Sequence, residues 1–374
     1  MKIGIVTWFH YENYGTKLQA IALQHYIRKL GHEVELINFY PPEPPKKSLR
    51  NSTPSEIVKK IKNRINKIIL HPKITKYTKQ IKEHSQKLSK IIDDTCILSP
   101  QITNKKDYIN VCNSYDLLIF GSDQIWNPNW YHPYYYANFD EINTKRIGYA
   151  PSLGVSKLTL DESSKLKSSL IKFENVYIRE KSGAKIVSSL LNKDIQNVVD
   201  PTLLLSNDEW IEILNIKKND SKKYVLCYFL GDNKNHWRAV SKFVKDKNLD
   251  LKIIPSTLAS YNQKGDIQAN SGVEDFTKLI YNAAYIITDS FHGTIFSIIF
   301  KKQFYTFERF SNTTKSSQNA RIHDLLNDLN LNNRLLQFDS VEINNDIDID
   351  YKKTMNILNE MTYKSKALLS SNLK

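Results

Sequence analysis

KIGIVTWFHYENYGTKLQAIALQHYIRKLGHEVELINFY (residues 2–40) indicates what kind of sheet this chain builds. Residues 2–9 form an apolar run typical of a buried strand, and residues 32–40 form a second one. Gly31 is a typical residue just past the end of a helix. Between the strands, apolar residues recur at helical spacing: Ala20, Leu23, Ile27 and Leu30. A strand, a helix and a strand in this order predict a βαβ unit, which is how a Rossmann-like parallel sheet begins.

The same alternation of strand and helix continues along the chain. In the first half, strands are predicted at residues 117–120, 146–150, 176–178 and 197–199. A second series of strands is predicted at residues 224–230, 251–254, 285–288 and 304–307. Two such series, joined near residues 206–221, predict an α/β protein with two Rossmann-like domains that face a cleft. We assign the first domain to residues 1–205, with a basic helical insertion at residues 46–95. The second domain is assigned to residues 222–345, and a final helix at residues 350–374 is expected to pack back on the first domain.

Composition restricts the class of protein. The chain has 374 residues, and its three cysteines are widely spaced and form no CxxC pair, so we expect neither a disulfide framework nor a zinc site. The first apolar run is seven residues long, and no run approaches the roughly 20 apolar residues that cross a bilayer. We therefore expect a cytoplasmic protein without a secretory signal or a membrane-spanning helix.

Most of the net charge of +14 comes from one segment. Residues 46–90 contain 14 Lys and Arg against two acids, a local net charge of +12. A helix-start pattern at Thr53-Pro54 and isoleucines at helical spacing from Ile57 to Ile69 predict a helix that ends at Pro72. The helix is either docked on the protein by its isoleucines or attracted to anionic lipid. Nucleic acid is disfavoured because the segment lacks interleaved aromatic residues and matches no nucleic-acid-binding motif.

Polar motifs fall where predicted strands turn into helices, the edge at which open parallel sheets bind ligands. The first, at residues 13–16, places a glycine before a helix N-terminus, whose free N–H groups can face an anion. The second, GSDQIWNP at residues 121–128, has more polar and aromatic side chains than a plain surface loop needs. The binding residues predicted in these two motifs are Asn13, Tyr14, Gly15, Thr16, Ser122, Asp123, Gln124 and Trp126.

A third motif, DSFHGT, separates two apolar runs at residues 289–294. Asp289 or Ser290 can cap the helix that follows, but capping does not explain His292. A histidine at a helix start meets the positive end of the helix dipole, which favours the neutral imidazole and suits it to proton transfer at neutral pH. We therefore predict His292 as the catalytic residue, with Asp289, Ser290, Gly293 and Thr294 as binding residues.

Together these motifs resemble the polysaccharide pyruvyl transferase family. The matching segments are NYGTKLQAIALQHYI (13–27), GSDQIWNP (121–128), VYIREKSG (176–183), VVDPTLLL (198–205), DSFHGTIFS (289–297) and NARIHDLL (319–326). They occur in family order over residues 1–330, nearly the whole chain. The resemblance implies a double-Rossmann architecture of the GT-B glycosyltransferase type. It also implies transfer of pyruvate from phosphoenolpyruvate to a sugar of a bacterial cell-surface polysaccharide, such as a capsule, or of its lipid-linked precursor.

The resemblance also points to residues that bind anions. The arginine of the family's strand-end motif corresponds to Arg179, and a later one corresponds to Arg321. Ser290-Phe291 stand where many members carry Arg-Leu before the histidine. Any role of that missing arginine in holding the donor must therefore move elsewhere, and Arg309 and Lys315 lie nearby in the sequence without a motif match.

The implied chemistry needs few protein groups. Phosphoenolpyruvate carries a carboxylate and a phosphate, which Arg or Lys side chains hold. Its enol carbon is protonated, a sugar hydroxyl attacks, phosphate leaves and a second hydroxyl closes the ketal. An imidazole can move these protons, so we expect no cofactor and no metal.

The expected partners are phosphoenolpyruvate, a lipid-linked sugar acceptor and, through residues 46–90, the anionic inner face of the membrane. Two alternatives stay open. One is a GT-B glycosyltransferase that uses a nucleotide sugar, because the same two-domain cleft supports it. The other is a non-catalytic member that docks at a membrane-bound polysaccharide assembly.

Overall fold

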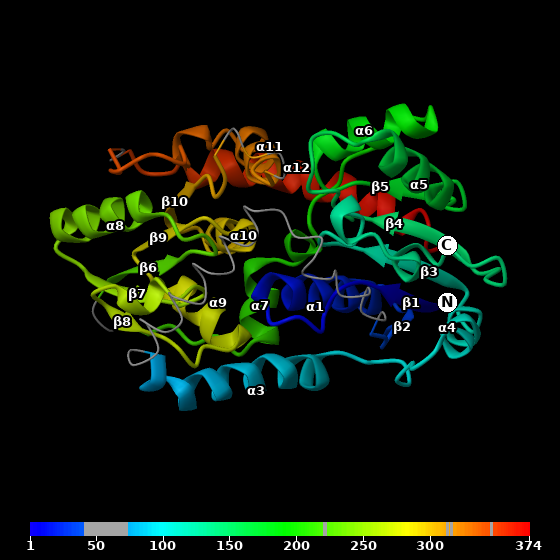
Figure 1. Ribbon diagram of the computed structural model, residues 1–374, viewed down its shortest axis with the longest axis horizontal. Coiled ribbons are helices and arrows are strands. Elements are labelled where there is room, and N and C mark those ends of the chain that lie inside the picture. The colour runs from blue at the N-terminus through cyan, green and yellow to red at the C-terminus, as the bar shows by residue number, and fades with distance from the viewer. Residues whose placement is uncertain (41–73, 220–222, 312–313, 315–316, 345–346) are drawn as a thin grey trace, which may run out of the picture.

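The structure is a computed structural model that describes residues 1–40, 74–219, 223–311, 314, 317–344 and 347–374. Its elements form two β-sheets, each flanked by helices, and the two halves lie next to each other (Figure 1). All strand pairings among the described residues of both sheets are parallel. An all-parallel sheet needs cover on both faces, and the described strands β3 (Leu117–Gly121) and β6 (Tyr224–Tyr228) are accordingly buried along their whole length.

The N-terminal sheet has the strand order β2-β1-β3-β4-β5. Its other strands are β1 (Lys2–Val6), β2 (Glu33–Leu36), β4 (Lys145–Tyr149) and β5 (Asn175–Tyr177). Its helices are α1 (Tyr14–Lys29), α4 (Lys105–Cys112), α5 (Leu160–Leu170) and α6 (Lys181–Leu191). Asn13 caps α1 by accepting a hydrogen bond from the Thr16 N–H at 3.3 Å. Past its end, Gly31 has a φ of +89°, the left-handed conformation that favours glycine.

The C-terminal sheet has the strand order β11-β10-β9-β6-β7-β8. Its other strands are β7 (Asp250–Ile253), β8 (Asp266–Ile267), β9 (Tyr285–Thr288), β10 (Gln303–Phe307) and β11 (Leu335–Leu336). The helices of this half are α8 (Lys234–Lys247), α9 (Val273–Asn282), α10 (Phe291–Ile299) and α11 (Ala320–Asp328). Short 3-10 helices lie at Pro128–Trp130, Pro133–Tyr136, Pro201–Leu204, Ser260–Asn262 and Asn332–Arg334.

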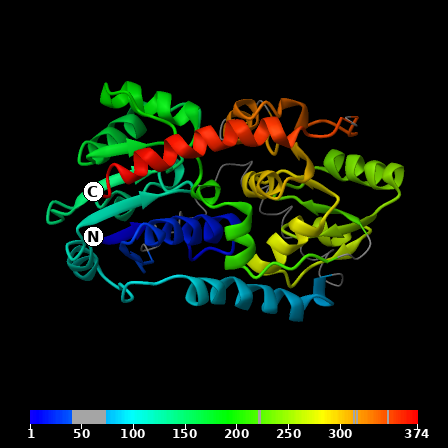
Figure 2. The same cartoon turned by 180° about the vertical axis from the view of Figure 1, so that it is seen from behind.

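Two long helices, α3 (Thr78–Thr95) and α12 (Tyr351–Ser370), run along opposite sides of the molecule and span both halves (Figures 1 and 2). From α3, His84 contacts the C-terminal half, with its Nδ1 2.6 Å from the carbonyl oxygen of Ser271. In α12, Tyr351 donates to the Ser297 carbonyl at 3.2 Å, while Ser365 accepts from the Val199 N–H at 3.0 Å. The last helix therefore contacts the C-terminal half at one end and the N-terminal half further on.

The strands predicted from sequence are present except at residues 197–199, where the chain forms an isolated bridge between Ile178 and Asn197. A single bridge forms there because residues 200–204 turn into a 3-10 helix. The expected joint at residues 206–221 contains a short helix, α7 (Asn207–Ile213). The short strands β8 and β11 have two residues each, too few for a periodic signal. The helix predicted between Thr53 and Pro72 lies outside the described residues.

Candidate active site

Both sheets have a topological switch point, where the first strand of the sheet in the chain lies between two later strands and the connections leave it in opposite directions. β1 lies between β2 and β3, and β6 lies between β7 and β9. Ligands of open parallel sheets bind beyond the carboxyl ends of the strands at such points. In the C-terminal sheet, the buried Asp289 joins the two strand ends, because it accepts from the N–H groups of Leu230 at 2.6 Å and Gly231 at 2.8 Å.

The two switch points meet where α1 and α10 begin. Ser290 is the N-cap of α10 and accepts from the Gly293 N–H at 3.2 Å, which places His292 in the first helical turn. The imidazole of His292 lies directly against Gly15 at the start of α1. A Cβ on residue 15 would stand 1.9 Å from Nδ1 and 2.4 Å from Cγ of His292. Glycine is therefore required at position 15 because the imidazole occupies the space of a side chain.

This contact predicts the effect of adding one methyl group. Gly15→Ala forces His292 or α1 to move, and we expect the free energy of unfolding to fall by about 1–3 kcal/mol. In Gly15→Ala/His292→Ala the clash is gone, so the double variant should be more stable than the sum of the two single changes implies. Denaturant unfolding of the four proteins measures the coupling. Strictly additive free energies would contradict the contact.

Asp200 is the residue that sequence reasoning missed, although its segment VVDPTLLL was noted. Its carboxylate is fully buried and accepts from Arg179 Nη1 at 2.9 Å and from Ser122 Oγ at 3.0 Å. The Thr202 N–H and hydroxyl bond its other oxygen at 3.0 and 2.7 Å. The only sequence signal was one acid between two apolar runs, directly before a proline.

His292 and Asp200 face each other across the two halves. The distance from His292 Nε2 to Asp200 Oδ2 is 3.6 Å, an ion-pair distance that is too long for a hydrogen bond. Burial alone would raise the pKa of the Asp200 carboxyl, but His292 and Arg179 hold that pKa well below its ordinary value. Asp200 is therefore a carboxylate at neutral pH. It is placed to stabilise the positive charge that His292 gains when it accepts a proton.

Two buried arginines flank Phe291. The guanidinium carbons of Arg179 and Arg321 lie 4.5 and 5.6 Å from the centre of the Phe291 ring, within cation–π distance. Arg309 lies beside them, donating from Nη2 to the Asp289 carbonyl at 3.0 Å. We call Arg179, Arg309 and Arg321, together with the Phe291 ring, the arginine cluster.

The three arginines of the cluster differ in how their charge is neutralised. Arg179 pairs with Asp200 and has its Nε 4.0 Å from Glu180, and the Nε of Arg309 lies 3.7 Å from Asp289. Arg321 instead donates to the carbonyl and side-chain oxygens of Gln318, and no described carboxylate forms an ion pair with it. Burial, followed by repulsion from Arg179 and Arg309, lowers the pKa of Arg321 to about 9, so it remains charged at neutral pH. Within the described part of the chain, Nε and Nη2 of Arg179 and Nε of Arg309 are buried without a hydrogen-bond partner. Unused N–H donors on positively charged side chains are groups that can bind an anion.

Several predicted binding residues brace the arginine cluster from the N-terminal half. Thr16 donates its hydroxyl proton to Asp123 at 2.6 Å, and Asp123 holds a left-handed backbone turn with a φ of 59°. Next to it, Gln124 donates to the side-chain oxygen of Gln318 at 3.0 Å, and that oxygen also accepts from Arg321 at 2.9 Å. A chain of hydrogen bonds thus runs from the first sheet to Arg321.

Other predicted binding residues are placed in packing positions rather than at the cluster. Trp126 is fully buried and donates to the Tyr135 carbonyl at 2.9 Å. Tyr14 stacks on Phe276 with ring centres 4.4 Å apart, and Thr294 is a fully buried residue of α10. Lys315 lies outside the described residues.

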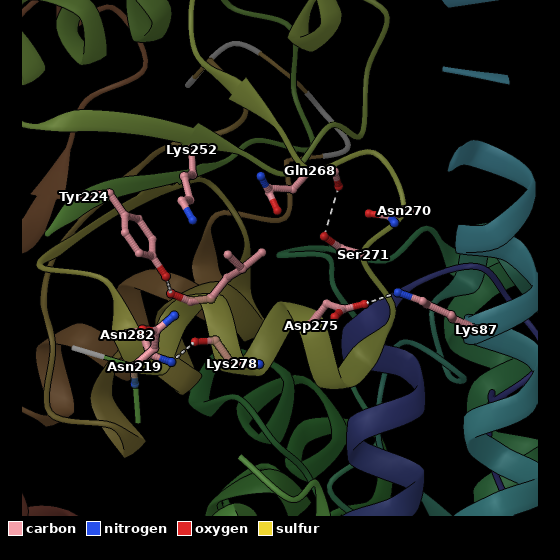
Figure 3. Close-up of a pocket in the computed structure, with 11 residues that line it drawn as sticks. Lys87, Asn219, Tyr224, Lys252, Gln268, Asn270, Ser271, Asp275, Lys278 and Asn282 are labelled. Carbon is pink, nitrogen blue, oxygen red and sulfur yellow. Dashed lines mark hydrogen bonds and ion pairs between the residues drawn. The ribbon is translucent and has the colours of Figure 1, made fainter. Parts of the chain in front are cut away.

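One small space borders the arginine cluster, and a larger pocket lies away from it. The space bordered by Arg179, Phe291 and Arg321 is about 30 Å³, which is enough for water only. A pocket of about 220 Å³ lies between α3 and α9 (Figure 3) and is lined by none of the predicted site residues. Its lining includes Lys87 and Lys252, and Lys87 is already paired with Asp275 at 2.6 Å.

Two parallel sheets flanked by helices, with their switch points facing each other, define an α/β protein of the GT-B fold. The sequence profile of the polysaccharide pyruvyl transferase family matches residues 13–312. That match spans most of the chain, and the protein therefore belongs to the polysaccharide pyruvyl transferase family, a family of transferases. The predictions of family, fold class and transferase activity are confirmed.

Solved structures resemble the chain in fold alone. A candidate UDP-N-acetylglucosamine 2-epimerase from Listeria monocytogenes has a TM-score of 0.50 at 10% identity, and the match covers 98% of this chain and 91% of that one. The UDP-GlcNAc 2-epimerase of Methanocaldococcus jannaschii gives 0.49 at 10% identity over 97% of this chain and 100% of that one. No curated protein matches the sequence. Among the described residues, no helix is long and apolar enough to cross a membrane.

Proposed function

We propose that this chain transfers pyruvate from phosphoenolpyruvate to a sugar of a bacterial cell-surface polysaccharide or of its lipid-linked precursor. Membership of the family supports pyruvyl transfer. The observation that carries the choice of donor is the arginine cluster, whose buried guanidiniums have unused N–H groups beside His292. Phosphoenolpyruvate has a carboxylate and a phosphate close together, and guanidinium groups bind both kinds of anion in paired fashion.

In this proposal, Arg179 and Arg321 hold the two anionic groups of the donor, and Arg309 assists them. The space between these side chains is about 30 Å³, too small for the whole donor. Donor binding therefore requires Phe291 to move or the two halves to separate slightly. Because Arg179 belongs to the N-terminal half and Arg321 to the C-terminal half, a donor bound to both would hold the halves together.

The reaction balances without an oxidant or reductant. A sugar hydroxyl attacks C2 of phosphoenolpyruvate while a proton adds to C3, which becomes a methyl group. A second sugar hydroxyl then attacks C2, the C2–O bond to phosphate breaks, and the two hydroxyl protons end on the methyl group and on the released phosphate. His292 accepts a hydroxyl proton and passes it on, while Asp200 stabilises the imidazolium formed between these steps.

The first test of this function is phosphate release. Purified protein is incubated with phosphoenolpyruvate and extracted lipid-linked saccharides, and inorganic phosphate is measured against a sample without saccharide. We expect phosphate release that depends on the saccharide. A parallel arm with nucleotide sugars tests the glycosyltransferase alternative, and nucleoside diphosphate release there, with no phosphate release from phosphoenolpyruvate, would contradict the proposal.

We also propose that the basic segment at residues 46–90 brings the protein to an anionic membrane surface, where lipid-linked acceptors lie. The described end of this segment is partly docked, since Leu88 of α3 is buried and Lys87 pairs with Asp275. Ten of the 14 Lys and Arg of the segment lie before α3 in the sequence.

Vesicles test this membrane proposal. We expect salt-sensitive binding to vesicles with anionic lipid and little binding to neutral ones. At about 1 kcal/mol for each cation, replacing five cations with Gln should weaken vesicle binding by up to about 5 kcal/mol, or several thousandfold, while turnover on a soluble acceptor is kept. The replaced residues are Lys59, Lys60, Lys62, Arg64 and Lys67. A matched control replaces the five cations of α8, which are Lys234, Arg238, Lys242, Lys245 and Lys247. Failure to bind anionic vesicles at low salt, or tighter binding to RNA, contradicts the membrane role.

A further inference from the structure

We propose that a second cavity, beyond the ends of β6 and β7, holds the acceptor and selects a sugar without negative charge. This inference rests on the proposed function and adds the place and the charge class of the acceptor. The cavity has a volume of about 630 Å³, within the range of small-molecule sites. We call it the interdomain cavity, because its walls come from both halves and from α3. Its lining includes Asn13 and Tyr14 of the N-terminal half, His84 of α3, and Tyr228, Asp232, Ser256, Thr257 and Tyr261 of the C-terminal half.

The chemistry of the lining suits a sugar ring. Tyr261 is half-buried and presents an aromatic surface, while Tyr14 and Tyr228 form the buried wall behind the cavity. Aromatic faces pack against the C–H faces of a sugar, and hydroxyl and carboxylate groups accept hydrogen bonds from its hydroxyls. Ser256 and Thr257 provide hydroxyl groups on the same wall as Tyr261.

The charge of the lining disfavours an anionic acceptor. Glu12 and Asp232 line the cavity, and the described lining residues include no Lys or Arg, although the chain has a net charge of +14. The pocket in Figure 3 differs, because Lys87, Lys252 and Lys278 line it. Two carboxylates, with no Lys or Arg among the described lining residues, repel a uronic acid or a nucleoside diphosphate more than a neutral sugar.

The interdomain cavity is connected to the arginine cluster through the peptide chain. Leu230, which lines the cavity, donates its N–H to Asp289, and Arg309 donates to the carbonyl of that same Asp289. On the other wall, Asn13 is two residues from Gly15, which lies against His292. In this proposal, the acceptor reaches His292 from the side of Asn13, and the donor reaches it from the arginine cluster.

Direct binding of small sugars tests this inference without turnover. The probes are the methyl glycosides of a neutral hexose, of a neutral N-acetylhexosamine and of a hexuronic acid, followed by ligand-detected NMR at neutral pH with the full-length protein. We expect a neutral glycoside to bind about tenfold more tightly than the uronide, and Tyr261→Ala to weaken it about tenfold. Asp232→Asn should narrow the difference between neutral and charged glycosides, an effect that a structural role would not produce. Lys252→Gln, in the pocket of Figure 3, is the matched control and should change nothing.

Three outcomes would overturn the assignment: no binding of either neutral glycoside, binding that Tyr261→Ala leaves unchanged, or a preference for the uronide. Calorimetry with phosphoenolpyruvate separates this result from the proposed function. Tyr261→Ala should bind phosphoenolpyruvate like the wild-type protein. A protein that binds neutral glycosides in the cavity but never binds phosphoenolpyruvate would contradict the proposed function and leave the cavity assignment standing.

Discussion

Replacing His292 with Ala is expected to lower kcat by roughly 10²–10⁴, measured as phosphate release from phosphoenolpyruvate in the presence of acceptor. The reason is geometric. His292 stands at the meeting point of the two switch points, with Nε2 3.6 Å from a buried carboxylate and without a hydrogen-bond partner in the described part of the chain. Removing the imidazole creates no clash with Gly15, so we expect the variant to fold.

His323→Ala is the matched control for this prediction. His323 is also an imidazole in the C-terminal half beside a carboxylate, Glu308, at 2.7 Å, but its side chain is 43% exposed. Its replacement should change kcat by less than about threefold. Near wild-type turnover in His292→Ala, or an equal loss in both variants, would remove His292 from the mechanism.

The second large effect concerns Arg321, whose removal should weaken binding of the donor without lowering the stability of the fold. Burial and repulsion by Arg179 and Arg309 lower its pKa to about 9, so the charged form is disfavoured in the folded protein. At neutral pH, below the pKa in the folded protein, Arg321 is charged in both the folded and the unfolded state, so its burial lowers the free energy of unfolding by the full amount. This destabilisation begins to decrease only when the pH exceeds the folded pKa, and it vanishes above the unfolded pKa. Arg321→Met should therefore keep or raise Tm. Phosphoenolpyruvate affinity should nevertheless fall by an amount worth about 1.5–3 kcal/mol.

Arg179→Met provides the contrast. Arg179 is the arginine that pairs with the buried Asp200, so its removal leaves that carboxylate without its paired cation and should cost about 3–5 kcal/mol of unfolding free energy. Thermal unfolding and calorimetry with phosphoenolpyruvate distinguish the two variants. An unchanged donor affinity in Arg321→Met, or a large loss of stability there, would show that the cluster does not bind the donor in the way proposed.

Local features of this fold were predictable from the sequence. The bounds of β9 agree with the predicted strand at residues 285–288, and Ser290 caps α10 as one of two predicted options. These features depend on hydrophobic periodicity and on capping groups within a few residues, which a sequence displays directly.

Features that depend on contacts between distant segments were not predictable. Gly15 was predicted as a binding residue at a helix N-terminus, but the group that fills its space is His292, 277 residues later in the chain. Asp200 was overlooked because a single buried acid has no periodicity, and its role depends on Arg179 and His292 meeting around it. Trp126 was assigned to binding because it stands in a polar loop, yet it packs under Gly148, where a Cβ would lie 2.5 Å from its ring.

The most direct test of the account follows labelled carbon from donor to acceptor. The protein is incubated with phosphoenolpyruvate labelled in its pyruvyl carbons and with extracted lipid-linked saccharides, and the saccharides are then recovered and analysed by mass spectrometry. The account predicts that labelled pyruvate appears as a ketal on one sugar, in equal amount to the phosphate released, and that neither appears with His292→Ala. Saccharides that stay unlabelled while the protein transfers a sugar from a nucleotide sugar would contradict it.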